Sequence, residues 1–469
     1  MEYKIGVVGL GVMGLNLALN MERNGFPVAG FNRDPKRTRA FLEGPAKGKA
    51  IIGTYSPAEL ISVLEKPRRI LLMVPAGGAV DDTITHLKSH LDSGDILIDG
   101  GNSHFLDTER RNIALEKENF QFMGTGVSGG EQGALWGPAI MPGGQREAWE
   151  ALAPIFRTIA AKAEDGEPCV EYIGPRGSGH YVKMIHNGIE YSDMQLIAEI
   201  YDILHRGAGL TAVELADVFS DWNKTELRSY LVEITAAVLK FTDPDTGNPL
   251  VDMILDEAQQ KGTGKWTSQN GFDLGAPIPS INAAVEGRIL SSLKTQRVAA
   301  SRIISGPSFK YTGSRAELIK AAQEALYASK VISYAQGMSM LQMASREYRY
   351  DLQLGEIAKI WRAGCIIRAG MLGDITSAYN RNPDLPNLLL DDAFREAVEK
   401  RQTSLRFIVQ TAVGLGIPVL ALGSTLAYFD SYRSERLPAN LTQAQRDYFG
   451  AHTYQRNDRQ GTYHTQWDS

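Results

Sequence analysis

Residues 5–14 read Ile5-Gly6-Val7-Val8-Gly9-Leu10-Gly11-Val12-Met13-Gly14, a short apolar run that enters a glycine turn. The three glycines after the run match the G-x-G-x-x-G spacing, and an amphipathic helical pattern follows over 13–24. In this motif the first glycine permits a tight turn, the second lets the backbone approach a pyrophosphate, and the third lets helix and strand pack closely. The helix N-terminus then faces the phosphates. We therefore predict a dinucleotide-binding domain at the start of the chain.

The end of the second predicted strand, Phe31-Asn32-Arg33-Asp34, bears on the choice of nucleotide. NAD sites usually carry an Asp or Glu there, which accepts hydrogen bonds from the ribose hydroxyls. Here a neutral Asn32 precedes Arg33, whose guanidinium can pair with a 2′-phosphate. NADP is therefore the predicted cofactor, although the carboxylate of Asp34 opposes phosphate binding.

The chain divides into three parts by its pattern. Over 1–177, β-rich runs alternate with helical patterns, which predicts an α/β Rossmann-type domain with a parallel sheet. Over 178–434 the pattern is helical, which predicts a large all-α domain; its segments 181–205 and 317–345 are similar enough to suggest a duplicated unit. The expected strands are 4–8, 27–31, 69–74, 96–99, 121–124 and 170–173, and the expected long helices are 181–205, 227–240, 281–305, 317–345 and 393–415.

An extended C-terminal tail, 435–469, loses the apolar period of the helical part. It contains Arg446 and His452 among several tyrosines and arginines, residue types that favour docking over disorder. We expect a segment without helical periodicity that gains order only by docking.

Composition excludes several classes of protein. The net charge is −5 with no run of like charges, so we expect no nucleic-acid partner. Apolar stretches such as 417–422 are too short for a membrane span, and we expect no signal peptide. The two cysteines exclude a disulfide framework and fit the reducing cytoplasm, and eight scattered histidines predict no metal site.

The segment 183–191 carries the strongest catalytic pattern. Lys183, His186, Asn187, Glu190 and Tyr191 follow the spacing that places them on one face of a helix. Exposed faces favour Glu, Lys and Gln, whereas this face carries His, Asn and Tyr. A desolvated lysine can act as a base and a desolvated glutamate as an acid, so we predict a catalytic helix. The alternative is an ion pair on the helix surface.

Three further clusters are expected to line the site. Residues 98–103 and 124–130 follow predicted strands, where ligand crevices form, and the second is expected to be a loop whose backbone N–H groups can hold a carboxylate. The run 261–266, Lys-Gly-Thr-Gly-Lys-Trp, is similar to a phosphate-holding turn without the Walker spacing.

Four runs resemble those of the decarboxylating 6-phosphogluconate dehydrogenases. They are GTGVSGG (124–130), HYVKMIHNGIEY (180–191), KGTGKWTSQ (261–269) and LPANLTQAQRDYFGAHT (437–453). The resemblance implies oxidation of 6-phosphogluconate by NADP and loss of carbon dioxide to give ribulose 5-phosphate. It also implies a homodimer in which each tail reaches the partner's active site.

The resemblance also implies roles for single residues. Lys183 would take the C3 hydroxyl proton, and Glu190 would protonate C1 after carbon dioxide leaves. The substrate would be held by Asn102, Ser128, Gly129, Gly130, His186, Asn187, Tyr191, Lys261, Thr263, Arg288, Arg446 and His452. NADP would be held by Gly9, Leu10, Gly11, Val12, Met13, Gly14, Asn32, Arg33, Asp34, Val74, Pro75, Ala76 and Asn102.

The chain departs from the family pattern at four positions. Pro75 stands where the family usually has lysine, and Asp34 where it has Thr or Ser. Both changes are expected to weaken NADP binding. Ser192 replaces a glycine and Gly11 an alanine. Two alternatives to the enzyme stay open, a non-catalytic NADP sensor and a scaffold protein that acts through its tail.

Overall fold

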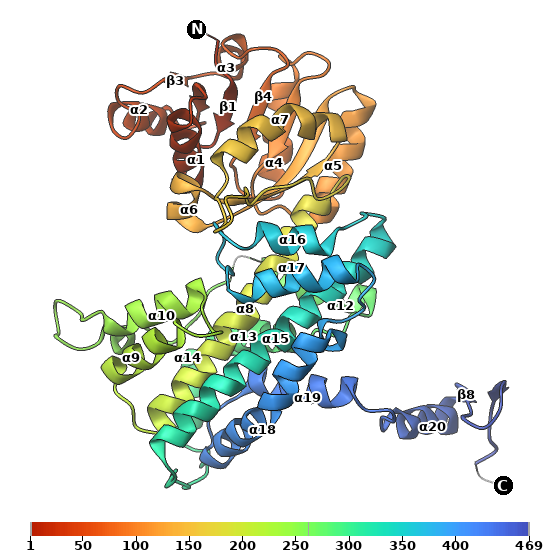
Figure 1. Ribbon diagram of the computed structural model, residues 1–469. Coiled ribbons are helices and arrows are strands. Elements are labelled where there is room, and N and C mark those ends of the chain that lie inside the picture. The colour runs from red at the N-terminus through yellow and green to blue at the C-terminus, as the bar shows by residue number, and fades with distance from the viewer. Residues whose placement is uncertain (1, 261, 468–469) are drawn as a thin grey trace.

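The computed structural model describes residues 2–260 and 262–467. Figure 1 shows a sheet-containing part at the N-terminal end, a large helical part below it, and a tail that extends to one side. No helix of the described residues is long and apolar enough to cross a membrane.

The described residues of the N-terminal part form a seven-stranded sheet in the order β3-β2-β1-β4-β5-β6-β7. β1 to β6 run parallel, and β7 pairs antiparallel with β6. The order reverses between β1 and β4, and in such sheets the ligand crevice lies at the carboxyl ends of those two strands. The strands are β1 (Ile5–Val8), β2 (Val28–Phe31), β3 (Ile51–Thr54), β4 (Arg69–Leu72), β5 (Ile96–Asp99), β6 (Gln121–Ser128) and β7 (Ala139–Gly144).

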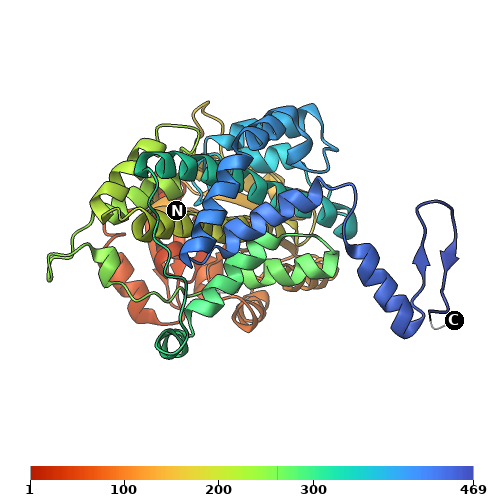
Figure 2. The same cartoon turned by 90° about the horizontal axis from the view of Figure 1, so that it is seen from below.

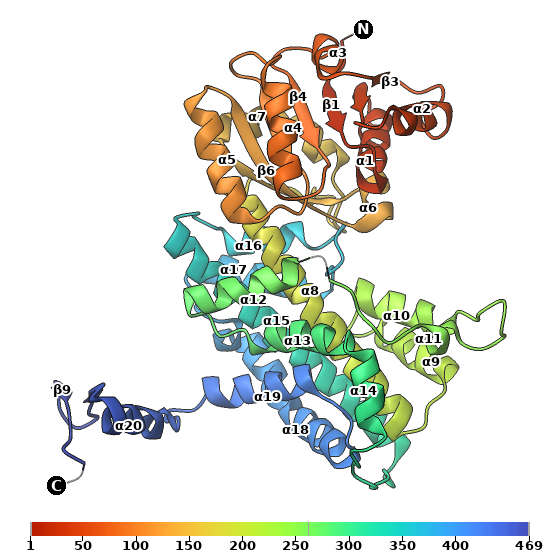
Figure 3. The same ribbon diagram turned by 180° about the vertical axis from the view of Figure 1, so that it is seen from behind.

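Helices cover both faces of this sheet, so the predicted α/β fold class is confirmed (Figures 1 and 3). They are α1 (Val12–Arg23), α2 (Pro35–Glu43), α3 (Pro57–Ser62), α4 (Gly78–Lys88), α5 (Phe105–Lys117), α6 (Gly130–Trp136) and α7 (Arg146–Ile159).

Four expectations about the sheet were wrong. β3 was missed, and 170–173 makes only an isolated bridge, Ile140 to Val170. β7 was missed because it contains Pro142 and two glycines, which argue against a strand. The backbone of Pro142 faces away from β6, where its carbonyl accepts from Ile173 N at 2.9 Å, so the missing N–H removes no hydrogen bond to β6. β6 continues to Ser128, so 124–128 is strand and not the expected loop.

The helical part is organised around two long helices, α8 (Ser178–Asp202) and α15 (Arg315–Tyr348), which pack on each other. α8 begins against the sheet and continues into the helical part (Figure 1). The others are η1 (Ile203–Gly207), α9 (Ala212–Trp222), α10 (Tyr230–Lys240), α11 (Leu250–Met253), α12 (Thr263–Leu274), α13 (Pro279–Ser291), α14 (Lys294–Ser301), α16 (Leu354–Ile360), α17 (Met371–Arg381), η2 (Leu388–Leu390), α18 (Asp392–Leu415) and α19 (Leu420–Tyr432).

The segment 281–305, expected as one helix, is divided between α13 and α14. Ser291 and Ser292 stand at the break, and their hydroxyls donate to the carbonyls of Arg288 and Ile289 at 2.7 Å. Such side-chain bonds compete with the helical ladder, which explains why an apolar period alone did not locate the break.

The tail stands away from the helical body in all three views (Figures 1, 2 and 3). It contains α20 (Ala439–Gly450) and a hairpin of β8 (Tyr454–Gln455) and β9 (Thr462–Tyr463). The expectation of a segment without helical structure is therefore wrong. α20 has no apolar period because it has almost no buried face: Asp447 is its one buried residue.

Asp447 joins the parts of the tail. Its carboxylate accepts hydrogen bonds from the backbone of Thr453 and Thr465, from His464 Nδ1 and from Trp467 Nε1, at 2.9 to 3.0 Å. Thr453 follows the turn at the end of α20, and the other two side chains lie beyond the hairpin. One carboxylate thus connects the helix, the turn and the C-terminal end of the tail.

Candidate active site

The catalytic helix is positioned by close backbone contact between α8 and the edge of the sheet. A Cβ at Gly126 on β6 would lie 2.4 Å from Lys183 Cβ, and a Cβ at Gly179 would lie 2.3 Å from the Gly124 carbonyl oxygen. Contacts this short cannot be relieved without moving the helix. Gly124 and Gly126 therefore have a packing role, because they bring α8 against β6.

Lys183 lies at the centre of a buried polar cluster on α8. Its ammonium donates to Asn187 Oδ1 at 2.5 Å and lies 3.5 Å from His186 Nδ1. The same Asn187 donates from Nδ2 to Thr263 Oγ1 at 3.0 Å, and His186 Nε2 lies 3.2 Å from Ser128 Oγ. The cluster joins α8, the end of β6 and the start of α12. Four residues predicted for the site, together with the lysine, are thus in mutual contact.

Glu190 lies one turn beyond His186, with its carboxylate 3.8 Å from His186 Nδ1. Burial raises the pKa of this carboxyl group, an effect that the charges of Lys183 and Arg288 oppose. Burial also lowers the pKa of the Lys183 ammonium, with Glu190 opposing. Both shifts have the direction that an acid and a base acting near neutral pH require.

His186 is fully buried, and burial together with the nearby Lys183 holds its pKa well below the ordinary value. The ring is therefore neutral and carries one N–H. It lies edge-on to Trp361, with ring centroids 5.6 Å apart. Trp361 was not found from sequence because it is 175 positions from His186 and lies in no recognisable motif.

A second group of predicted residues lies around Tyr191. The Arg288 guanidinium stands over its ring, 3.5 Å from the centroid, and the ring fits beside Gly264 of α12. Among the described residues, Arg288 donates to the Gln259 carbonyl and the Met194 sulfur and to no carboxylate, so its charge is available to an anion. Lys261, predicted for the same group, lies outside the described residues.

The glycine turn is tightly packed at Gly14 and open at Gly11. A Cβ at Gly14 would lie 1.9 Å from the Gly9 carbonyl oxygen, which explains why only glycine fits there. A Cβ at Gly11 would meet nothing within 4 Å, and no side chain caps the start of α1. Open space in front of uncapped helical N–H groups is what a pyrophosphate needs. Leu10 points inward and is buried, whereas Val12 is exposed.

The three residues after β2 differ in their contacts. Asn32 Oδ1 accepts from Leu10 N at 3.0 Å and so joins the end of β2 to the glycine turn. Asp34 caps α2 by accepting from Lys36 N at 3.0 Å. Arg33 is exposed and makes no hydrogen bond or ion pair within the described chain, which leaves its guanidinium free.

The remaining predicted residues lie on loops at the carboxyl end of the sheet. Val74, Pro75 and Ala76 follow β4, and Asn102 follows β5 with its side chain exposed. At the end of β6, Ser128 is buried and Gly129 and Gly130 begin α6. Among the described residues, no group of three or more His, Cys, Asp or Glu side chains could hold a metal ion.

Arg446 and His452 are not brought to this cluster by their own chain. Both lie on the projecting tail (Figure 2), and neither makes a hydrogen bond or ion pair with the residues around Lys183 in the described structure. Arg446 bonds Gln443 instead, and His452 packs on the ring of Phe449.

Comparison with known proteins agrees with this geometry. The family described as the C-terminal domain of 6-phosphogluconate dehydrogenase matches residues 179–467, and the NAD binding domain of 6-phosphogluconate dehydrogenase matches residues 4–174. The chain belongs to the 6-phosphogluconate dehydrogenase family. The resemblance noted from its four sequence runs is therefore confirmed.

Two bacterial members of the 6-phosphogluconate dehydrogenase family illustrate the similarity. The NADP(+)-dependent, decarboxylating 6-phosphogluconate dehydrogenase of Bacillus subtilis is 57% identical over 467 residues, 99% of each chain. The decarboxylating enzyme of Escherichia coli K12 matches to the same extent. A solved 6-phosphogluconate dehydrogenase of Plasmodium falciparum, described with NADP+ and with 6-phosphogluconate, is 44% identical, with a TM-score of 0.95 over 99% of this chain and 100% of that one.

Proposed function

We propose that this protein is an NADP-dependent, decarboxylating 6-phosphogluconate dehydrogenase that converts 6-phosphogluconate to ribulose 5-phosphate and carbon dioxide in the cytoplasm. The observation that carries the proposal is the buried cluster of Lys183, His186 and Asn187, with Glu190 one turn away on the same face of α8. The names of the relatives support the same substrate and cofactor.

Oxidation begins with Lys183. Its lowered pKa favours the neutral amine, which accepts the proton of the C3 hydroxyl. NADP, when bound, would accept the hydride that leaves C3. A 3-keto acid results, and its C1–C2 bond can break because the new carbonyl takes up the electron pair. The Lys183 ammonium, now beside that oxygen, stabilises the enolate as carbon dioxide leaves.

Glu190 completes the reaction as an acid. Its raised pKa keeps a proton available, and delivery of that proton to the enediol carbon, C1 of the product, gives ribulose 5-phosphate. His186, Asn187 and the Ser128–Gly130 turn would hold the carboxylate and hydroxyls, together with Asn102. Tyr191, Thr263, Arg288 and Lys261 would hold the 6-phosphate.

The active enzyme is a homodimer with composite sites in this proposal. The projecting tail, with Arg446 and His452 exposed on it, supports the idea, because the tail carries these residues away from its own body (Figure 2). A phosphate dianion held by Lys261 and Arg288 alone would be partly neutralised, and Arg446 from the partner would add a charge-assisted contact.

An absorbance assay at the nicotinamide band tests the proposal, with 6-phosphogluconate and either NADP or NAD, and with carbon dioxide measured in parallel. Reduction of NADP with equal release of carbon dioxide is expected. Binding of NADPH without turnover would instead identify a sensor, and absence of both would favour a scaffold protein.

A further inference from the structure

Arg111 of α5 is buried between two loops that flank the cofactor crevice. Its side chain is 2% exposed and donates to the Gly77 carbonyl at 2.9 Å and to both oxygens of Asp81, at 2.8 and 3.1 Å. Gly77 is the N-cap of α4 and directly follows the loop 74–76. The guanidinium therefore holds the beginning of α4 and the loop before it.

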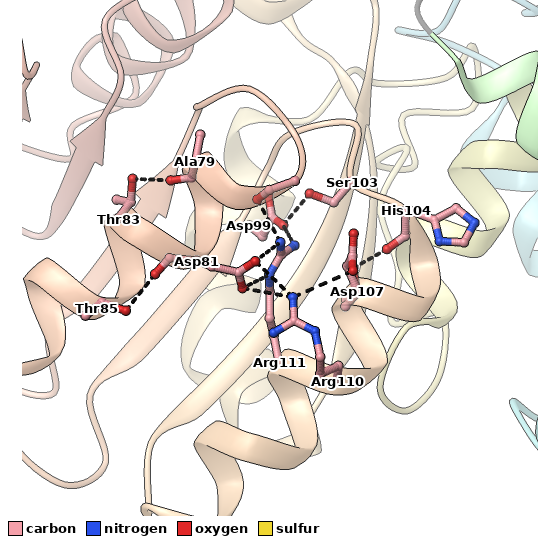
Figure 4. Close-up of polar contacts among 12 residues, drawn as sticks. Ala79, Asp81, Thr83, Thr85, Asp99, Ser103, His104, Asp107, Arg110 and Arg111 are labelled. Carbon is pink, nitrogen blue, oxygen red and sulfur yellow. Dashed lines mark hydrogen bonds and ion pairs between the residues drawn. The ribbon is translucent and has the colours of Figure 1, made fainter.

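The same guanidinium holds the loop after β5. Arg111 Nη1 lies 3.4 Å from Asp99 Oδ2, and Asp99 is fully buried. Asp99 in turn accepts from Gly101 N at 3.1 Å and from the Ser103 hydroxyl at 2.6 Å. These two residues flank Asn102, so its backbone is fixed on both sides. Figure 4 shows Asp81 of α4 and Asp99 at the end of β5 beside Arg111, with Ser103 bonded to Asp99.

The two loops also contact each other. A Cβ at Gly100 would lie 2.7 Å from Leu71 and Met73, and one at Gly101 would lie 3.0 Å from the Val74 carbonyl oxygen. Gly101 thus lies directly against the backbone of Val74, at the start of the other loop. Arg111 donates hydrogen bonds to both loops, to the Gly77 carbonyl of one and to Asp99 of the other.

We propose that Arg111 is a positioning residue that sets the spacing of the 74–77 and 99–103 loops for NADP binding. The inference rests on the proposed function, since it assumes that these loops hold NADP. Lysine cannot replace this arginine, because a single ammonium group cannot span Gly77, Asp81 and Asp99 in the geometry of a planar guanidinium. Hydrogen bonds from Arg111 lower the pKa of Asp81 to about 2, so the pair is fully ionised at neutral pH.

The adjacent Arg110 offers a matched control. It also bonds Asp81, at 2.9 and 3.0 Å, but its side chain is 55% exposed. Its other ion pair is with Asp107 of its own helix, and it has no hydrogen bond to either loop. If a charge near Asp81 were all that mattered, the two arginines would be equivalent.

The test is calorimetric titration of NADPH into the full-length enzyme and its variants, with thermal unfolding recorded for each. Arg111→Lys should raise the Kd for NADPH by about tenfold or more, because a displaced loop loses aligned contacts. The Kd for 6-phosphogluconate in the cofactor-free enzyme should rise by a smaller factor, no more than about threefold, because Asn102 is the one proposed substrate contact on these loops and the Lys183 cluster does not touch Arg111. Arg110→Ala should change neither value by more than about twofold.

If Arg111→Lys does not fold, Asp81→Asn tests the same inference. Asp81 is partly exposed, and a neutral amide there weakens its ion pair with Arg111. The Asp81→Asn variant should also have a higher Kd for NADPH than the wild type. Unchanged NADPH binding by a folded variant would overturn the inference. Equal losses for both ligands, or equal effects of Arg110→Ala and Arg111→Lys, would also overturn it. Failure of the wild type to bind NADPH would instead refute the proposed function.

Discussion

Lys183 donates a hydrogen bond to the side-chain oxygen of Asn187, one helical turn further along α8. Asn187 in turn donates to Thr263, so its amide is held with the oxygen toward the lysine. An amide oxygen orients the ammonium group without adding a full negative charge. The pKa of Lys183 can therefore stay below its ordinary value of 10.5, as burial requires.

Asn187→Asp should therefore shift the pH profile. A carboxylate beside Lys183 stabilises the ammonium form and raises its pKa, so the acidic limb of kcat/KM should move to higher pH. The wild-type profile should be a bell, because activity is lost as Lys183 becomes protonated at low pH and as Glu190 loses its proton at high pH. The measurement is kcat/KM against pH, and an acidic limb that stays in place would contradict this assignment.

Lys183→Met should abolish oxidation, because the other nitrogen base beside Asn187, His186, has a pKa held well below its ordinary value and is too weak to replace the lysine. Binding of 6-phosphogluconate should persist, as measured by calorimetry. Residual turnover close to that of the wild type would refute the role of Lys183 as the base.

Glu190→Gln should retain substrate binding while kcat falls by about 10²–10⁴, the usual contribution of a general acid. The amide keeps the size of the side chain and removes its proton. The alkaline limb of the pH profile should disappear in this variant, and a limb that persists at the same pH would assign the acid to another group.

Cofactor preference should respond to Asp34 and Pro75. Asp34→Thr removes a carboxylate beside the free Arg33 while keeping an oxygen that can cap α2, and Pro75→Lys adds a cation on the loop after β4. Each change should tighten NADP more than NAD, measured as the ratio of kcat/KM values. Equal responses of the two cofactors would show that charge near the 2′-phosphate does not set the preference.

Catalysis should require two subunits. Truncation before Leu437 should raise the KM for 6-phosphogluconate sharply or destroy activity, and should weaken dimerisation. A stricter measurement mixes two inactive variants, Lys183→Met and Arg446→Ala. In a heterodimer one site carries both defects and the other neither, so activity should return on subunit exchange. Heterodimers that form without recovering activity would show that Arg446 does not act across the interface.

Sequence period and motif spacing predicted the parts of the site that lie on one element. The face of α8 that holds Lys183 and Glu190 follows from the helical repeat, and the glycine turn follows from its spacing. Contacts between distant segments could not be predicted in this way. Arg110 and Arg111 are adjacent and chemically identical in the sequence, yet only the fold buries one of them against Asp99. β7 was not predicted, because its proline argues against a strand unless its position at the edge of the sheet is known.

The four hydrogen bonds to Asp447 bear on how two subunits would meet. Burial alone would raise the pKa of this carboxyl group, but the hydrogen bonds outweigh it and lower the pKa to about 2, so the carboxylate is ionised from mildly acidic pH upward. His452 sits between Ala451 and Thr453, both with positive φ, and Thr453 is tied directly to that carboxylate. A tail in this state has already lost most of its conformational freedom before it touches a partner. In the proposed dimer the tail would meet its partner already ordered, so assembly would be limited by encounter and not by folding of the tail.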